Sequence, residues 1–129
     1  MTSRIFSIPV DCSDAEGLAA FWAEVLGWSI TARGWQRTEH GPDGVTIAPN
    51  NGDRTEIDFR WTPDGNTDGK NRIHFDVNPT DCDQETEFAR LLDLGARQVD
   101  IGQRADSTWY VLADPEDNVF CLCRSRVDP

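Results

Sequence analysis

The hydrophobic pattern of the first half predicts one strand, one helix and then three more strands. Apolar and polar side chains alternate over residues 5–10, which is the period of a half-buried strand. The next apolar residues recur at spacings of three and four, as on one face of a helix: Leu18, Phe21, Trp22, Val25 and Leu26. Turn-forming residues then separate strand-like runs at 28–38, 44–48 and 55–62.

The two ends of this helix carry signals of their own. Ser13 and Glu16 match a capping box, in which the hydroxyl caps the helix and the carboxylate reaches back to the cap. Gly27 follows the last apolar residue, where left-handed backbone favours a residue without a β-carbon. We therefore expect the helix to lie between Ser13 and Gly27.

The second half repeats this order of elements. Residues 10–14 have a counterpart 67 positions later in residues 77–81. A strand is predicted over 71–78, a helix over about 80–94, and strands near 97–101, 108–112 and 119–124; the helix is expected to bury Phe88, Leu91 and Leu92. The repeat predicts a single α+β domain of two tandem βαβββ modules, about 1–67 and 68–129, which form an incomplete barrel around a cleft.

Composition and charge narrow the range of partners. The chain of 129 residues has 23 acidic against 12 basic side chains and a net charge of -11. Such a charge repels phosphate groups, so neither nucleic acid nor a membrane surface is an expected partner. No stretch approaches the roughly 20 apolar residues of a membrane span, and the N-terminus lacks a signal-peptide pattern. A cytoplasmic protein that binds a small molecule is the expectation.

The four cysteines fit that expectation, because cytoplasmic thiols stay reduced. None of them forms a C-x-x-C pair, so a structural zinc site has little support. Cys121 and Cys123 are two residues apart and share one face of a strand. They either fill a core or pocket wall as small side chains, or take part in metal or redox chemistry.

Three segments, in the right order, resemble the vicinal oxygen chelate (VOC) superfamily and its small glyoxalase-like group (glyoxalase/bleomycin resistance/dioxygenase fold). Asp14 with residues 21–27 resembles the pattern D-x(n)-F-Y-x-x-x-L-G at the first helix. Residues 70–77 resemble the K-N-R-x-H-x-D stretch that opens the second module. Residues 112–122 resemble the closing D-P-E-G-N-x-F-C-L, with Asp117 where glycine is usual. The resemblance covers essentially the whole chain and specifies the fold better than the reaction.

The resemblance also implies a set of metal-ligand positions, because catalytic VOC proteins hold one divalent ion on the first and last strands of both modules. His74 matches one such position, and the repeat places Ser7 at its counterpart. The last strand of the first module offers Glu56 or Asp58, and the second offers Cys121 where glutamate is usual. Serine is a poor metal ligand, so the best metal set is His74, Glu56 and Cys121. No cofactor is assigned on this basis, and the glyoxalase I reaction is not expected.

Two functions therefore stay open. One is an enzyme, a lyase or isomerase of a small polar molecule, in which His74 acts as base or donor beside Glu56 or Asp58. The other is a metal-free binding protein, like the drug-sequestering resistance proteins of the superfamily, which holds a ligand between aromatic walls. In a third interpretation His74 is a purely structural, half-buried histidine.

The expected pocket combines aromatic and polar side chains. Trp35 and Trp109 are the aromatic candidates for its walls, and Ser7 and Cys121 are polar candidates. Arg60 either anchors an anionic ligand or pairs with its acidic neighbours. Exposed sheet edges are compatible with pairing of two chains into a homodimer.

Overall fold

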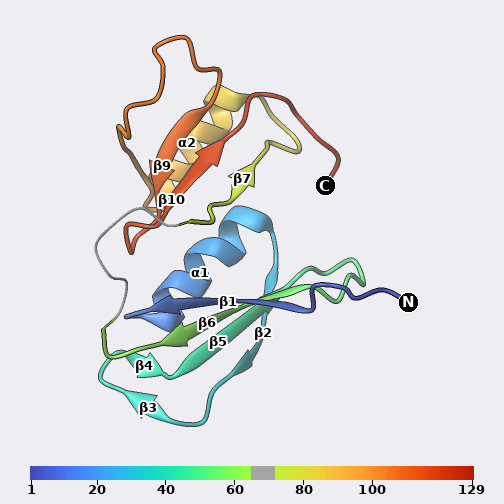
Figure 1. Cartoon of the computed structure of the whole chain (residues 1–129), viewed down its shortest axis with the longest axis vertical. Coiled ribbons are helices and arrows are strands. Elements are labelled where there is room, and N and C mark those ends of the chain that lie inside the picture. Colours follow the sequence, from blue (N-terminus) through green and yellow to red (C-terminus); the bar gives the residue numbers. More distant parts are fainter. Residues whose placement is uncertain (65–71) are drawn as a thin grey trace. The chain divides into compact units, whose positions relative to one another are not determined.

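The computed structural model describes residues 1–64 and 72–129. The chain divides into two compact units, Met1–Thr67 and Asp68–Pro129. Within the described residues, each unit contains one helix and one open four-stranded sheet, coloured blue to green in the first unit and yellow to red in the second (Figure 1). The predicted α+β fold class is confirmed.

The first unit has the sheet order β1-β6-β5-β2, in which β1 is parallel to β6 and the other pairs are antiparallel. Its elements are β1 (Ser7–Cys12), α1 (Ala15–Leu26), β2 (Ser29–Arg33), β5 (Gly44–Ala48) and β6 (Glu56–Trp61). Between β2 and β5, the short strands β3 (Arg37–Thr38) and β4 (Gly41–Pro42) pair as a separate hairpin.

The second unit has the order β7-β10-β9-β8, again with the first strand parallel to the last. Its elements are β7 (Asp76–Val77), α2 (Gln84–Leu94), β8 (Arg97–Gln98), β9 (Tyr110–Ala113) and β10 (Val119–Leu122). Strand for strand, this is the order of the first unit. The repeat read from the sequence is therefore a repeat of topology.

The helix ends differ slightly from the prediction. Asp14, not Ser13, caps α1: its side chain accepts a hydrogen bond from Gly17 N at 3.0 Å. A β-carbon on Gly17 would lie 2.4 Å from the Asp14 carboxylate, so glycine leaves the room that this cap needs. Asp83 caps α2 by accepting from Thr86 N at 2.8 Å, and α2 therefore starts at Gln84 rather than near residue 80.

Each helix covers one face of its own sheet. In the first unit, Val45, Ile47 and Phe59 are fully buried and α1 contacts β5 and β6. In the second unit Leu91 is fully buried and the Phe88 ring stacks on Tyr110 at 4.2 Å. Leu92 was predicted to be buried but is 38% exposed. The buried stripe of α2 is rotated toward Glu87, which lies 8% exposed and paired with Arg90.

Several strands are shorter than predicted. The run 28–38 breaks after Arg33, because the Gly34 amide bonds to Gly44 O at 2.8 Å and the chain turns into the β3–β4 hairpin. A β-carbon on Gly34 would lie 1.9 Å from Asp43 Oδ1, so a larger residue in this turn would have to displace the Asp43 side chain. Of the strand predicted over 71–78, residue 71 lies outside the described residues and the strand itself is Asp76–Val77.

Candidate functional site

The sheet face opposite α1 carries the polar residues predicted in the first module. Because Ile57 and Phe59 of β6 are buried, alternation puts Glu56, Asp58 and Arg60 on the other face. Glu56 and Asp58 are half-buried and Arg60 is exposed. Ser7 of β1 lies directly opposite Glu56 in the parallel register. The first unit thus brings four predicted site residues onto the face of its sheet that α1 does not cover.

Asp58 is held firmly on this face. Its Oδ1 accepts a hydrogen bond from Thr46 Oγ1 at 3.1 Å, and its Oδ2 accepts one from Arg60 Nε at 2.9 Å. Arg60 therefore pairs with its acidic neighbour, which was one of its two predicted roles. Both oxygens of Asp58 are already engaged, so Glu56 is the less committed carboxylate of the two.

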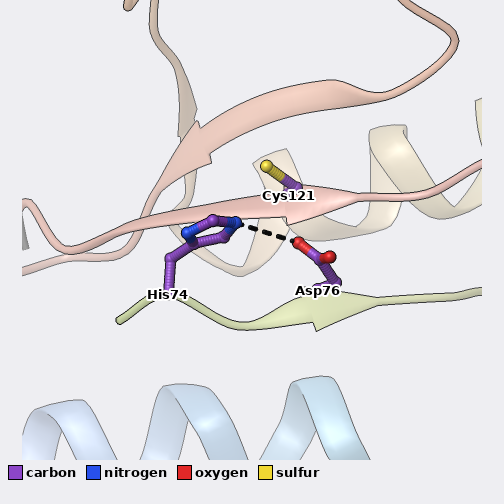
Figure 2. A group of neighbouring side chains, drawn as sticks. All are labelled: His74, Asp76 and Cys121. Carbon is purple, nitrogen blue, oxygen red and sulfur yellow. Dashed lines mark ion pairs between the residues drawn. The ribbon is translucent and has the colours of Figure 1, made fainter. Parts of the chain in front are cut away.

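The second unit gathers three chemically active side chains. His74 precedes β7, Asp76 lies on β7, and Cys121 lies opposite Asp76 on β10 (Figure 2). His74 Nε2 is 3.2 Å from Asp76 Oδ1, and one ligand atom from each of the three residues lies within 4.8 Å of the others. The two polar side chains are about half exposed, at 49% and 59%, whereas Cys121 is 8% exposed.

Asp76 was not predicted as a site residue. It follows His74 by two positions, so on an extended chain both side chains fall on one face. The same spacing appears in the H-x-D part of the motif at residues 70–77. That period of two was the available signal for Asp76.

The surroundings of Cys121 disfavour its thiolate form. Burial raises its pKa most, and the Asp76 carboxylate and then Cys123 raise it further. Burial and Asp76 also raise the pKa of Cys123. Both thiols are therefore neutral at physiological pH, and Cys121 offers a weak hydrogen-bonding group rather than a reactive thiolate.

The strand registers relate the two modules residue by residue. In the first unit Pro9 lies opposite Asp58, and in the second Asp76 lies opposite Cys121. Pro9 and Asp76 are 67 residues apart, which is the offset of the repeat. Asp58 is therefore the counterpart of Cys121. The sequence had favoured Glu56, two residues earlier, for this position.

The two predicted tryptophans differ in their surroundings. Trp35 lies between β2 and β3 and is 96% exposed. Trp109 directly precedes β9, is 43% exposed and lines a hollow in the second unit. Within the units, Ser7, Glu56, Asp58 and Arg60 come together in the first, and His74 with Cys121 in the second.

The family model of the glyoxalase-like domain matches residues 7–123. The chain is a glyoxalase-like member of the VOC superfamily. No curated protein sequence matches it. Within the described residues, no helix has the length and apolarity that crossing a bilayer requires.

Solved structures share the fold of this glyoxalase-like protein at low identity. TnmS3, an antibiotic binding protein from Streptomyces sp. CB03234, is 23% identical with a TM-score of 0.60, over 96% of this chain and 98% of that one. FosX, the fosfomycin resistance protein of Mesorhizobium loti, is 11% identical with a TM-score of 0.70, over 98% and 95%. FosX of Listeria monocytogenes, in complex with Mn(II), is 12% identical with a TM-score of 0.70, over 98% and 96%.

The superfamily implies a divalent metal ion, so the side chains at its ligand positions can be compared with what such an ion requires. Manganese and magnesium prefer carboxylate and imidazole ligands, and a metal-binding cysteine must be a thiolate. Here the usual carboxylate position carries the soft sulfur of Cys121, and Ser7 offers a neutral hydroxyl. The residues at the family positions thus do not fit a manganese or magnesium ion. His74, Asp76 and Cys121 are ligand types that only a thiophilic ion such as zinc accepts together.

Proposed function

We propose that this glyoxalase-like protein binds a small organic molecule of the antibiotic type and releases it chemically unchanged. The observation that carries the proposal is the chemistry at the family's metal positions. Ser7 is a neutral hydroxyl, and the pKa of the Cys121 thiol is raised by burial and by Asp76. Such groups hydrogen-bond a ligand without polarising it for reaction. The antibiotic-binding function of TnmS3, which has the same fold, supports this choice.

His74 is the side chain we expect to recognise the ligand. Its Nε2 lies 3.2 Å from Asp76 Oδ1, which fixes the ring and, in the neutral imidazole, the proton on Nε2. The second ring nitrogen, Nδ1, then remains as a hydrogen-bond acceptor. Because the side chain is 49% exposed, a ligand reaches it without displacing protein atoms.

A binding screen tests this proposal. The full chain is titrated with bleomycin, other glycopeptide and aromatic antibiotics and fosfomycin, while melting temperature and tryptophan fluorescence are followed. We expect at least one compound to raise the melting temperature, and mass spectrometry to recover that compound intact. His74→Ala should weaken binding about tenfold or more, since a hydrogen bond to a ligand is lost and Asp76 is left unpaired.

The matched control is His40→Ala, which removes the only other histidine, an exposed residue of the first unit. It should bind like the wild type. Equal loss of affinity in both variants, or full affinity in His74→Ala, would contradict the assigned role of His74.

A second candidate function is a lyase or isomerase that depends on a metal ion, and the trio His74, Asp76 and Cys121 favours it. Here zinc would be held by a nitrogen, an oxygen and a sulfur from one unit. Equilibrium dialysis against zinc and manganese decides between the candidates. Stoichiometric zinc binding that Cys121→Ser abolishes, together with product formation from any compound that binds, would favour the enzyme.

We further propose that the protein has no nucleic-acid or membrane partner, because its net charge of -11 repels phosphate groups. A cytoplasmic location is proposed from its four free cysteines, since cytoplasmic thiols stay reduced. Pairing of two chains at exposed sheet edges is a separate proposal. Light scattering tests it directly: a homodimer has twice the 14.5 kDa mass of one chain.

A further inference from the structure

The second unit contains a hollow that the proposed function does not use. It has a volume of about 670 Å³, within the range of small-molecule pockets. Three segments form its walls: the start of α2, the residues that lead into β9, and the chain after β10; they contribute Gln84, Glu85, Ser107, Trp109, Arg124 and Arg126. His74, Asp76 and Cys121 are not part of this wall.

Two of these walls are tied together. The side-chain amide of Gln84 donates to Thr108 O at 2.9 Å and to Leu122 O at 3.1 Å. The Tyr110 hydroxyl donates to Glu85, and this hydrogen bond raises the pKa of Tyr110. The hollow is therefore a formed feature of the unit, since α2 is fastened to both β9 and β10.

The third wall is an extended tail fixed by backbone hydrogen bonds. Cys123 N donates to Val77 O at 2.8 Å and Val127 N donates to Pro79 O at 2.9 Å. Between them Ser125 O accepts from the Asn78 amide at 2.8 Å. Arg124 and Arg126 alternate with these anchored residues, and both line the hollow.

The acidic and basic side chains of the hollow differ in whether they already have a hydrogen-bond partner. Asp83 caps α2 and Glu85 accepts from Tyr110, so both acids have donors. Neither Arg124 nor Arg126 has an ion pair or hydrogen bond with any residue in 1–64 or 72–129. Ser107 Oγ is buried and likewise lacks a hydrogen-bond partner among those residues. Arg124 and Arg126, which are both exposed, are thus the charged side chains of the hollow that no described residue pairs with.

We infer that this hollow is a second ligand site, which takes a flat organic anion such as an aromatic carboxylate or sulfonate. Guanidinium groups bind carboxylates through paired, charge-assisted hydrogen bonds, and Arg124 with Arg126 supplies two of them. The ring of Trp109, 43% exposed, offers a face on which the flat part of the ligand packs. The inference concerns a site apart from the His74 face and does not depend on the proposed function.

Titration of the full chain with 2-naphthoate tests the inference, and 2-naphthamide serves as the uncharged comparison. Binding is followed by NMR through the indole N–H signal of Trp109, which a Trp109→Phe variant assigns. We expect naphthoate to shift that signal and to bind at least about tenfold more tightly than naphthamide. A hydrogen bond between guanidinium and carboxylate, both charged, is stronger than one between guanidinium and a neutral amide. Arg124→Gln with Arg126→Gln should remove this preference.

The control variant is Arg104→Gln, which changes an exposed arginine of the same unit that already pairs with Asp106 and does not line the hollow. It should bind naphthoate as the wild type does, and so should His74→Ala, which separates this site from the proposed function. Equal affinity for naphthoate and naphthamide, unchanged affinity in the double arginine variant, or no shift of the Trp109 signal would overturn the inference.

Discussion

At the scale of single residues, the chemistry of the second unit depends on how Asp76 affects its two neighbours. It orients the His74 ring from 3.2 Å and it adds to the burial that keeps Cys121 protonated. The negative charge of Asp76 therefore favours His74 as a hydrogen-bonding group and disfavours Cys121 as a nucleophile. This is the residue-level reason for preferring binding to covalent chemistry.

Removing that charge has a measurable effect on Cys121. In Asp76→Asn the thiol pKa should fall toward its ordinary value, although burial, the larger cause, keeps part of the shift. At mildly alkaline pH more of the thiol is then ionised, and iodoacetamide should alkylate Cys121 several-fold faster, as peptide mass spectrometry measures. Asp93→Asn, an exposed acid of α2, should leave the rate unchanged. A wild-type rate in Asp76→Asn would show that Asp76 does not act on this thiol.

The sequence predicted His74 and Cys121 as site residues but did not predict Asp76, which lies beside them. The resemblance supplied both positions, and a period of two would have added Asp76. The choice between Glu56 and Asp58 depended on strand register, which local patterns leave undetermined because a shift by two preserves the face. Only the pairings of Pro9 with Asp58 and of Asp76 with Cys121 resolve the register.

At the scale of elements, we expect the cap of α2 to depend on pH through Asp83. Hydrogen bonds from Thr86 hold the pKa of Asp83 below its ordinary value of 3.8. A lowered folded-state pKa means that the cap stabilises the fold fully above the unfolded-state value, and that this stability is lost as pH falls through the folded value. In urea unfolding, the advantage of the wild type over Asp83→Ala should therefore shrink below about pH 4.

Asp83→Ser supplies the control for that experiment, because a hydroxyl caps a helix without titrating in this range. Its advantage over Asp83→Ala should stay constant with pH. A wild-type advantage that is equally independent of pH would mean that the Asp83 carboxylate does not cap α2 in solution.

The turn between β9 and β10 depends on a buried carboxylate. Asp114 is 2% exposed, and its Oδ1 accepts hydrogen bonds from Glu116 N at 2.9 Å and Asn118 N at 3.0 Å. Asp114→Ala leaves these amides without their acceptor, and we expect the free energy of unfolding to fall by about 2–3 kcal/mol in denaturant titrations. Asp100→Ala removes a similar bond to Gly102 N in an exposed loop and should cost less than about 0.5 kcal/mol. Equal losses in both variants would contradict the account of this turn.

Element types were predictable from the sequence, whereas their lengths were not. Apolar periodicity located both helices, and Gly27 and Gly95 end them in left-handed conformations, with φ of 68° and 118°. The strand predicted over 97–101 contracts to Arg97–Gln98, which pairs with β9, and Val99 adds one last hydrogen bond from its amide to Val111 O. Strand length is set by a partner distant in sequence, which propensity alone does not contain.

At the scale of the whole molecule, the repeat was the strongest signal. Residues 10–14 and their counterpart 77–81, 67 positions later, predicted two modules. Both sheets have the same strand order, with the first strand of each module parallel to its last. The reaction did not follow from the fold, because a fold accommodates many chemistries and the site decides between them. Here Ser7 and Cys121 differ from the residues that metal chemistry in this superfamily requires.

The most direct test of ligand binding without turnover is an NMR titration of the full chain with the antibiotic that binds best, followed by mass spectrometry of that compound. Binding should shift the amide signals of residues 74–76 and 119–123, with the antibiotic recovered at its original mass after incubation with zinc or manganese. A new product mass, or amide signals that stay unchanged in both segments, would contradict the account.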